Sequence, residues 1–529
     1  MITATGSYAP RFLPVRLPRI CVPIMGSNPA DMVQKADAVL RDNPFIEFRL
    51  DYLPKPGLAL QKIKTFVEYH PEAIIIATCR RAANGGKFRG SVASEVDILV
   101  KAANQGCHLV DLEVESAAQL KPGDFNRLRR SANLILSYHD FRGTRKLEET
   151  LARMTEYPAD FLKIVSTANT LYDNVVMMKF LERHSHEHSM IGLCMGEQGI
   201  ISRVLAVRAG SQFTFGALGP GEETAPGQIF ARALQDVYRI EQVDAATRVY
   251  GVAGDPVAHS LSPTMLNTAF RRENVNGVYV ALHAKSLDDL LACVRDIPIH
   301  GLSITMPYKE EILKHLDKTD PLTAKIGACN TVVRSQDGKL YGFNTDVNGI
   351  VRPLETRMAL PEAKVLVLGA GGAARAAVFG LKERGAEVFV FNRTPGPAQN
   401  LAKKARAKAV NKMQLRKLAF DVIINATPVG MEGNREPIPI SEQEFNAKYF
   451  FEMVYTPAET KMVRLARAKG MHVILGAEMF VQQGARQFEI WTGKPAPVLE
   501  MQRVVEYALT TGNRAGNRQQ ATGNSRKSP

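Results

Sequence analysis

The sequence lacks the features that mark secreted, metal-binding and membrane proteins. Its 529 residues include only six cysteines, scattered without a C-x-x-C pair, and a single tryptophan. Most of the cysteines lie in strand-like apolar runs, which indicates reduced core residues of a cytoplasmic protein rather than a disulfide framework. No His/Cys cluster has the spacing of zinc ligands, so no metal site is expected. No apolar run reaches the length of a membrane span, so no membrane partner is expected either.

Both ends of the chain are expected to be loose tails. Residues 1–17 have no acidic residue and no apolar signal core, so a short loose tail is favoured over a remnant of a targeting segment. Residues 512–529, "GNRAGNRQQATGNSRKSP", are basic and nearly free of apolar side chains. Such a segment cannot bury enough surface to offset the entropy of ordering, so a disordered basic tail is expected there.

What the chain does have is positive charge and enough apolar residues for several domains. The 45% hydrophobic and 23% charged residues are typical of a folded protein, and the length suggests two to four domains. The net charge of +14 lies mostly in the second half, which suits nucleic acid or anionic small molecules. Because no stripe of interleaved arginines and aromatics appears, small anionic ligands are predicted and nucleic acid is not.

The first half alternates β-rich runs with helical stretches. Eight such runs occur at the spacing of βα units: 20–26, 45–53, 74–80, 109–114, 134–141, 161–165, 190–196 and 213–218. This pattern predicts an α/β fold, a (β/α)8 barrel over residues 18–240. Barrels of this kind place their chemistry at the C-terminal ends of the strands. Lys163 in the sixth run and His139 at the end of the fifth are therefore expected in one cavity.

Lys163 is the unusual residue of these runs, because it interrupts the apolar stretch "FLKIV" and lysine is rarely buried without a partner. Desolvation disfavours a charged ammonium, and a neutral amine is a nucleophile that can form an imine with a ketone. The simpler alternative is a lysine on the barrel rim with its ammonium in solvent. The catalytic interpretation is favoured by the polar residues at the ends of neighbouring runs, namely Arg49, Asp51, Arg80, His139 and Arg203.

The segments "EFRLDYL", "SYHDF", "GIISR", "TFG" and "APGQI", together with Lys163, resemble the type I 3-dehydroquinate dehydratase family. The resemblance implies that Lys163 forms an imine with the C3 ketone of the substrate. His139 would remove the C2 proton and then protonate the departing C1 hydroxyl. It also implies that Arg203 holds the ring carboxylate. The ring hydroxyls would be oriented by Glu47, Arg49, Arg80, Thr224 and Gln228, beside an apolar wall of Met195 and Phe215.

One position departs from that family. In "RRAANGG", Asn84 stands where the family usually carries an acidic residue thought to orient the histidine. An amide can hydrogen-bond but cannot stabilise an imidazolium by charge. An active dehydratase with a shifted pH profile is expected, and a simple loop role for Asn84 is the alternative.

The second half contains a nucleotide-binding pattern. "KVLVLGAGGAARAAVFGLKERGAEVFVFNRT" reads as a strand, a glycine turn, a helix and a second strand. The amides at the start of such a helix can hold a pyrophosphate, and Arg393 after the second strand suits the 2′-phosphate of NADP. A Rossmann NADP-binding domain is predicted over 351–476. Its expected cofactor contacts are Gly369, Ala370, Gly371, Gly372, Ala373, Asn392, Arg393 and Thr394.

The region before this turn carries candidate substrate groups. Ser260 and Ser262 can direct two hydroxyls at a carboxylate, and Lys309 with Asp346 suits proton exchange with a hydroxyl or ketone. A structural salt bridge is the simpler alternative for the lysine–aspartate pair. The motifs H-S-x-S-P, T-x-P-x-K, C-N-T-V, N-T-D, N-R-T and N-A-T, in this order, resemble the shikimate dehydrogenase family over residues 248–510.

This second resemblance implies a shikimate-binding α/β domain over 248–350 plus 477–511. Ser260 and Ser262 would bind the carboxylate, and Lys309 and Asp346 would manage the proton at the C3 oxygen while NADPH delivers a hydride. Ring hydroxyls would contact Thr305, Asn330 and Gln483. The cofactor would lie along Thr427, Met431, Gly476 and Met479, with Tyr455 at the cleft; packing roles are the alternative for Thr427, Met431, Tyr455 and Met479. Ser303 replaces an asparagine often found two residues before Thr305.

The product of the first implied reaction is the substrate of the second, which favours one bifunctional enzyme. A class I aldolase would share Lys163 but has no reason to carry Arg203 and "APGQI". A metabolite-sensing regulatory protein built on the same domains would be expected to lose one of the four catalytic groups, and all four are present: Lys163, His139, Lys309 and Asp346. The oligomeric state, monomer or homodimer, stays open.

Overall fold

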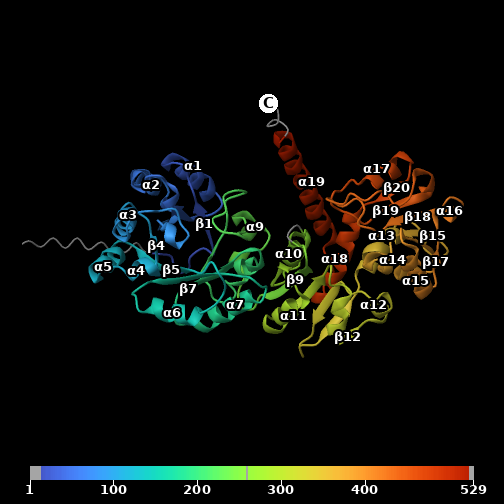
Figure 1. Cartoon of the computed structure of the whole chain (residues 1–529), viewed down its shortest axis with the longest axis horizontal. Helices are drawn as coiled ribbons and strands as arrows, with labels where there is room; N and C mark the ends of the chain where they lie inside the picture. Colours follow the sequence, from blue (N-terminus) through green and yellow to red (C-terminus); the bar gives the residue numbers. More distant parts are fainter. Residues whose placement is uncertain (1–12, 258–259, 524–529) are drawn as a thin grey trace, which may run out of the picture. The chain divides into compact units, whose positions relative to one another are not determined.

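The computed structural model describes residues 13–257 and 260–523, with side chains through Thr511. The chain divides into two compact units (Figure 1). The first ends at Thr247 and includes Leu282–Pro298; the second contains Arg248–Ala281 and the chain from Ile299 onward. The division thus counts Leu282–Pro298, which lies inside the predicted 248–350 domain, with the first unit.

The first unit is built on an eight-stranded parallel sheet in the order β7-β6-β5-β4-β3-β2-β1-β8. Its strands are β1 (Ile20–Ile24), β2 (Phe45–Arg49), β3 (Ile74–Thr78), β4 (Leu109–Glu113), β5 (Asn133–His139), β6 (Phe161–Thr167), β7 (Met190–Met195) and β8 (Thr214–Phe215). Each of the eight predicted runs contains or overlaps one of these strands. Because β8 pairs back onto β1, the sheet curls into a nearly closed barrel, and the predicted barrel is confirmed.

Helices connect the strands and lie around the barrel (Figure 1). They are α1 (Pro29–Leu40), α2 (Leu60–Tyr69), α3 (Val92–Asn104), α4 (Val114–Ala117), α5 (Pro122–Ser131), α6 (Leu147–Thr155), α7 (Asp173–His184), α8 (Ser202–Leu205) and α9 (Ala231–Asp236), with α11 (Leu287–Asp296) counted in the same unit. Short 3-10 turns are η1 (Leu50–Tyr52), η2 (Pro56–Ala59), η3 (Ala82–Asn84), η4 (Glu197–Gly199) and η5 (Ile240–Gln242). The first helix shows why they begin where they do: Asn28 caps two backbone N–H groups of α1 and Pro29 follows at its first position.

The barrel interior changes from apolar to polar along the strands. Alternate strand residues point inward. A buried apolar cluster contains Phe45 on β2, Leu109 on β4 and Ile135 on β5. Two residues further along, the same strands carry Glu47, Asp111 and Ser137, and Lys163 pairs in register with Ser137. The lysine therefore belongs to a polar layer above an apolar floor.

The second unit contains two sheets. The first is mixed, in the order β10-β9-β11-β13-β14-β12. Its strands are β9 (Arg248–Gly254), β10 (Gly277–His283), β11 (Ile299–Ile304), β12 (Lys318–Thr319), β13 (Thr331–Arg334) and β14 (Leu340–Phe343). The helices of this part are α10 (Ser262–Arg272), α12 (Pro321–Ile326), α18 (Gly476–Thr492) and α19 (Val498–Gly523), with the turn η6 (Glu311–His315). Trp491 of α18 donates to the Val332 carbonyl at 3.1 Å, which anchors this helix on the sheet.

The second sheet is parallel, in the order β17-β16-β15-β18-β19-β20. Its strands are β15 (Lys364–Leu368), β16 (Glu387–Phe391), β17 (Lys408–Ala409), β18 (Phe420–Asn425), β19 (Ala447–Glu452) and β20 (His472–Ile474). The accompanying helices are α13 (Asp346–Glu355), α14 (Gly372–Glu383), α15 (Pro395–Ala405), α16 (Lys412–Leu415) and α17 (Lys461–Ala468), with the turn η7 (Glu442–Glu444).

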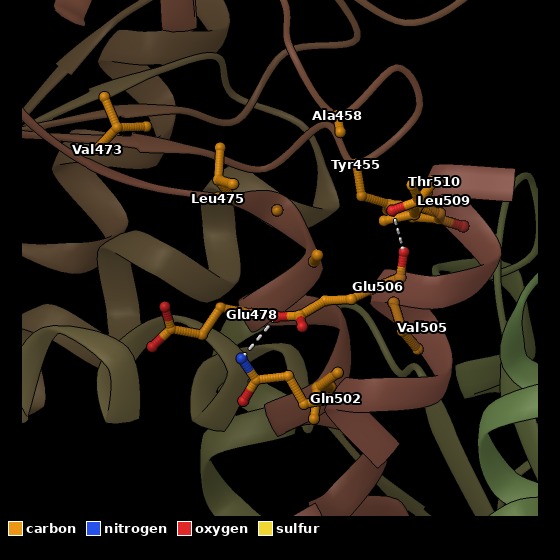
Figure 2. Close-up of a pocket in the computed structure, with 13 residues that line it drawn as sticks. Tyr455, Ala458, Val473, Leu475, Glu478, Gln502, Val505, Glu506, Leu509 and Thr510 are labelled. Carbon is orange, nitrogen blue, oxygen red and sulfur yellow. Dashed lines mark hydrogen bonds between the residues drawn. The ribbon is translucent and has the colours of Figure 1, made fainter. Parts of the chain in front are cut away.

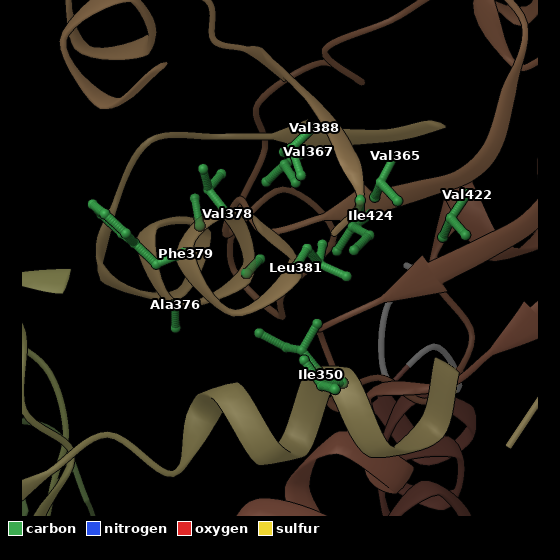
Figure 3. Close-up of a cluster of buried hydrophobic side chains, with 14 of the residues drawn as sticks. Ile350, Val365, Val367, Ala376, Val378, Phe379, Leu381, Val388, Val422 and Ile424 are labelled. Atoms are coloured by element: carbon green, nitrogen blue, oxygen red, sulfur yellow. The ribbon is translucent and has the colours of Figure 1, made fainter. Parts of the chain in front are cut away.

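Both faces of this parallel sheet are buried, which explains the uninterrupted apolar run of β15. Val365 and Val367 pack with Ile350 and Leu381 from α13 and α14 (Figure 3). Leu366 and its neighbours join a second core on the opposite face. Parallel strands covered on both faces lose the alternation of polar and apolar residues.

The predicted C-terminal tail differs from the structure over its first residues. Helix α19 continues to Gly523, so the first part of the expected disordered tail, from residue 512, is helical. Met501 and Val505 anchor the start of this helix in a core, no proline interrupts the segment, and an anchored helix adds residues without a new nucleation cost. Residues 524–529, and residues 1–12 of the predicted N-terminal tail, lie outside the described residues.

Candidate active sites

Lys163 forms a buried ion pair at the centre of the barrel. Its Nζ lies 2.8 Å from Asp111 Oδ2 and 4.1 Å from the centre of the Phe215 ring, and the residue is 4% exposed. Ser137 donates to Asp111 Oδ1 at 2.6 Å. Burial opposes ionisation of Asp111, but the charges of Lys163 and Arg80 outweigh it and hold its pKa well below the usual range. Asp111, which was not among the polar neighbours expected for Lys163, reaches it from β4, two strands away in the sheet.

His139 lies at the end of β5, and its Nε2 is 2.7 Å from Nη1 of Arg80. Because an arginine nitrogen can only donate, this contact assigns the hydrogen of the neutral ring to Nδ1. Burial, with the positive charges of Arg80 and Lys163, holds the pKa of His139 well below its ordinary value. The ring is therefore a neutral base at pH 7, with its acceptor nitrogen Nε2 facing Arg80.

Arg203 on α8 is a buried cation without a carboxylate partner among the described residues. It is 1% exposed, its Nη2 donates to the Pro226 carbonyl at 3.2 Å, and its Nε has no partner. Burial lowers its pKa to about 10. Since an unpaired buried charge is costly, this guanidinium is poised for an anionic group.

The other predicted residues of this site lie at the same ends of the strands. Arg49 forms two hydrogen bonds to Asp51, at 2.9 and 2.8 Å. Glu47 accepts from Thr78 at 2.6 Å. Thr224 and Gln228 follow β8 and bond each other, the Thr224 backbone N–H donating to Gln228 Oε1 at 2.8 Å. The predicted wall residues Met195 and Phe215 are both buried.

Asn84, in η3, makes no hydrogen bond to His139 in the described part of the chain. Its Nδ2 and the Nδ1 of His139 are both buried without a partner. Buried polar atoms are normally paired, so both nitrogens are available to a further partner. The pH profile expected from Asn84 stays a prediction.

In the second unit the structure brings Lys309 and Asp346 together. Lys309 Nζ donates to Asp346 Oδ2 at 2.6 Å, and Asn330 donates to Oδ1 at 2.7 Å. Lys309 follows β11 and Asp346 begins α13, so strand ends and a helix start converge here. The side chains are 23% and 7% exposed, which leaves the lysine accessible to a ligand.

A buried hydrogen-bond network that sequence reasoning missed supports this pair. Gln487 of α18 donates to the Asn330 carbonyl at 3.2 Å and accepts from Ser303 at 2.8 Å. Tyr279 donates to Ser303 at 2.6 Å. Ser303, expected to be a tolerated replacement, is thus a link between β11 and α18. The glutamine could not be found from the sequence because no local motif singles it out from its neighbour Gln483.

The remaining predicted substrate residues lie after strands β9 and β11 and in helices α10 and α18. Ser260 Oγ accepts from the Ser262 backbone N–H at 3.2 Å. The Thr305 N–H donates to Ala253 at 3.0 Å, which ties the end of β11 to β9. Gln483 donates to the Phe480 carbonyl at 2.9 Å, leaving its amide oxygen for another partner.

The glycine turn after β15 fits a dinucleotide. Gly369 has φ +112°, and a Cβ there would lie 2.9 Å from the Ala426 carbonyl oxygen, so only glycine suits the turn. A Cβ at Gly371 would meet open space, and no side chain caps the first amides of α14. A Cβ at Gly372 would lie 3.9 Å from Lys309 Cδ. The pyrophosphate-binding end of α14 therefore adjoins the lysine of the catalytic pair.

The predicted NADP-selecting arginine has a partner that the sequence did not suggest. Arg393 Nη1 lies 3.0 Å from Glu436 Oε1, with the arginine side chain 74% exposed. Asn392 donates to the Thr394 carbonyl at 2.8 Å, which shapes the loop. An exposed pair of this kind contributes little energy, so a 2′-phosphate can replace the carboxylate.

Four further residues were predicted along the cofactor or at the cleft. They lie in α18 or after strands of the parallel sheet: Met431, Tyr455, Gly476 and Met479. Met479 is buried, with its carbonyl oxygen 2.8 Å from a Cβ placed at Gly349 of α13, whereas Met431 is exposed. Tyr455 and Gly476 line a cavity of about 270 Å³ with residues of α19 (Figure 2). Lys309, Asp346 and Asn330 are not in its lining. The ring of Tyr455 stacks on that of Phe480, with their centres 4.8 Å apart, so Tyr455 makes a packing contact in this structure.

Thr427 is linked through Asn425 to the buried carboxyl group of Glu452, which the sequence did not indicate. Thr427 Oγ1 donates to Asn425 Oδ1 at 2.6 Å, and Asn425 donates to Glu452 Oε1 at 2.7 Å. Thr460 donates to the other oxygen of Glu452 at 2.7 Å. Burial outweighs the hydrogen bonds from Asn425, Thr460 and the backbone, and raises the pKa of Glu452 to about 7.

The unfolding free energy of the second unit is expected to fall as the pH rises from about 4.5 to about 7. The folded state binds more protons than the unfolded state in this window, so stability decreases with pH there, by on the order of 3 kcal/mol. Glu452→Gln keeps one acceptor oxygen and removes the titrating group, so it should flatten this slope. Urea unfolding at several pH values would measure it, and equal slopes in both proteins would contradict the assignment.

The arrangement defines a chain with two enzyme units, a barrel with a buried lysine–aspartate pair and a second unit whose glycine turn fits a dinucleotide beside another such pair. Family models agree with this division. The model for type I 3-dehydroquinase matches residues 20–245, and that for the shikimate dehydrogenase substrate binding domain matches 252–332. The model for shikimate / quinate 5-dehydrogenase matches 354–431, and that for the shikimate 5′-dehydrogenase C-terminal domain matches 476–506.

The chain is also similar to individual proteins. The bifunctional 3-dehydroquinate dehydratase/shikimate dehydrogenase, chloroplastic, of Arabidopsis thaliana is 35% identical over 510 residues, which are 90% of this chain and 82% of that protein. The shikimate dehydrogenase (NADP(+)) of Methanosarcina acetivorans is 40% identical over 277 residues, 50% of this chain and 99% of its own. The solved shikimate 5-dehydrogenase of Thermus thermophilus is 37% identical, with a TM-score of 0.46, and covers 50% of this chain and 100% of its own.

The chain belongs to the family of bifunctional 3-dehydroquinate dehydratase/shikimate dehydrogenases. In the described ranges, no helix has the length and apolar content that a membrane span needs. All six cysteines are buried and free, as expected.

Proposed function

We propose that this chain dehydrates 3-dehydroquinate to 3-dehydroshikimate in the barrel and reduces the product to shikimate with NADPH in the second unit. One observation carries the proposal: each unit holds a lysine paired to a buried aspartate, Lys163 with Asp111 at 2.8 Å and Lys309 with Asp346 at 2.6 Å. A regulatory protein without turnover finds no support in the comparisons.

In the barrel, Arg203 binds the ring carboxylate and Lys163 attacks the C3 ketone. The carbonyl oxygen leaves as water, and a C=N⁺ bond to Nζ takes its place. This cation withdraws electrons from C2, so Nε2 of His139 can remove a C2 proton. The same histidine returns the proton to the C1 hydroxyl, which leaves as water, and hydrolysis of the imine frees the lysine. Arg80, Glu47 and Arg49 orient the ring hydroxyls.

In the second unit, Ser260 and Ser262 bind the carboxylate of 3-dehydroshikimate, and Thr305, Asn330 and Gln483 hold its hydroxyls. Bound NADPH supplies a hydride for the carbonyl carbon. Lys309 donates a hydrogen bond and then a proton to the developing alkoxide at C3, and Asp346 orients the lysine ammonium. The cofactor is held by Gly369, Ala370, Gly371, Gly372, Ala373, Asn392, Arg393, Thr394, Thr427, Met431, Gly476 and Met479.

The proposal includes the predicted domain limits, 18–240, 248–350 with 477–511, and 351–476. It also includes a cytoplasmic location, which the burial of the free cysteines supports, although the Arabidopsis relative is named chloroplastic. Monomer and homodimer both stay possible.

Purified chain mixed with 3-dehydroquinate and NADPH, without a helper enzyme, should consume NADPH. The measurement is the fall of NADPH absorbance, with 3-dehydroshikimate as the starting substrate in a parallel reaction. Reduction of 3-dehydroshikimate alone would refute the dehydratase half. Failure with both substrates would refute the whole proposal.

A further inference from the structure

A pair of buried carboxyl groups lies behind Arg80 in the barrel. Glu95 on α3 is fully buried and accepts from Ser116 of α4 at 2.7 Å through Oε2. Glu113, the last residue of β4, accepts from Arg80 Nε at 2.6 Å through Oε1. The other oxygens, Glu95 Oε1 and Glu113 Oε2, are buried and have no donor among the described residues. The two side chains lie within hydrogen-bonding reach of each other.

The charges around this pair do not balance if every group is ionised. The described part of the barrel buries five carboxyl groups and four cations: Glu47, Asp51, Glu95, Asp111 and Glu113, with Arg49, Arg80, Lys163 and Arg203. Glu95 forms no ion pair within the described ranges. Two carboxylates in contact away from water repel each other, and one proton between the two unpartnered oxygens would satisfy both.

We propose that Glu95 is a protonated positioning residue of the dehydratase site: its carboxylic acid donates to Glu113 and keeps that carboxylate fixed on Arg80. Arg80 in turn contacts His139 Nε2 at 2.7 Å and Asp111 at 2.9 Å, and Asp111 contacts Lys163. Glu95 therefore acts through Arg80 on both the base and the nucleophile. This inference rests on the proposed dehydratase function.

The surroundings of Glu95 agree with a proton at this place. Burial, and then the charge of Glu113, raise the pKa of Glu95 to about 9. The titratable or charged groups that face it are Glu113 on β4 and Arg81 and Cys79 just after β3; Ser116 on α4 is neutral. Arg81 opposes the shift but does not reverse it.

Two substitutions separate this role from a merely structural one. Glu95→Gln keeps an amide donor for Glu113 and an acceptor for Ser116, so kcat for 3-dehydroquinate at pH 7 should stay within about 2-fold of wild type. Glu95→Ala removes the donor and should lower kcat by about 10-fold or more, with KM changed much less. In wild type, ionisation of Glu95 should lower kcat on the alkaline side near pH 9, and Glu95→Gln should lack this decrease.

Infrared spectroscopy gives a readout besides activity. At pH 8, where Glu452 is largely ionised, the difference between the spectra of wild type and Glu95→Gln should contain a carboxylic acid C=O band. Reduction of 3-dehydroshikimate, which uses the second unit, reports that each variant is folded. The inference is overturned if Glu95→Gln loses as much kcat as Glu95→Ala, if the two pH profiles coincide, or if the infrared band does not change. If wild type does not dehydrate 3-dehydroquinate, the proposed function fails, and the infrared comparison still tests the proton on Glu95.

Discussion

Replacing Lys163 with alanine is expected to abolish dehydration of 3-dehydroquinate, with a loss in kcat on the order of 10⁴-fold or more. Without the amine no imine forms at C3, and the C2 proton is then too weakly acidic for His139 to remove. The same protein should still reduce 3-dehydroshikimate with NADPH at the wild-type rate, because Lys309 and Asp346 lie in the other unit. Formation of 3-dehydroshikimate, followed by its ultraviolet absorbance, measures the first activity.

A covalent test accompanies this variant. Borohydride added to wild type with 3-dehydroshikimate should reduce the imine to a stable amine, which mass spectrometry would locate on Lys163. Lys101→Ala, at an exposed surface lysine, is the matched control and should behave like wild type. An adduct on another residue, or dehydration retained in Lys163→Ala at a tenth of the wild-type rate, would rule out the imine mechanism at this position.

Replacing Lys309 with alanine should lower kcat/KM for reduction of 3-dehydroshikimate by about 10²- to 10⁴-fold, the usual contribution of a positioned general acid. The alkoxide that forms at C3 loses its proton donor, and Asp346 is left without the cation at 2.6 Å. Dehydration of 3-dehydroquinate should be unaffected. NADPH absorbance with 3-dehydroshikimate as substrate gives the rate.

Binding of the cofactor separates loss of chemistry from loss of NADPH in this variant. Lys309→Ala should quench and shift NADPH fluorescence as wild type does, since Gly371 and the start of α14 hold the pyrophosphate. Lys314→Ala, an exposed lysine in η6, should keep both activities. If Lys309→Ala retains reduction within about 3-fold of wild type, a structural salt bridge is the correct interpretation of the pair.

Sequence patterns predicted the barrel strands, the glycine turn and most of the side chains that the proposed function assigns to catalysis. Eight runs at βα spacing became the eight barrel strands, and the alternation of strand residues already placed Lys163 on the same face as Phe161 and Val165. The glycine turn predicted the start of α14 because a strand, a tight turn and a helix are all local in the chain. Lys309 and Asp346 stood at the ends of their motifs, and the structure brings them into contact.

The side chains that bind these residues in the folded protein could not be predicted from local sequence patterns. Asp111 is 52 residues from Lys163, and Glu436 is 43 residues from Arg393; no local spacing links either pair. Likewise, the sequence could not show that Gln487 holds Asn330, or that Glu452 holds Asn425, because helix α18 and strand β19 meet those residues only after folding.

The sequence by itself determined the fold of each unit, and it singled out the lysines, the histidine and the glycine turn that the proposed function uses, because these depend on local periodicity and on short motifs. Tertiary structure alone decided the electrostatic state of the sites. Closing the barrel puts five carboxyl groups and four cations out of water together, and the charge of each then depends on neighbours from other strands. That is why Lys163 meets a carboxylate, why His139 is neutral, and why Arg203 has no carboxylate partner among the described residues.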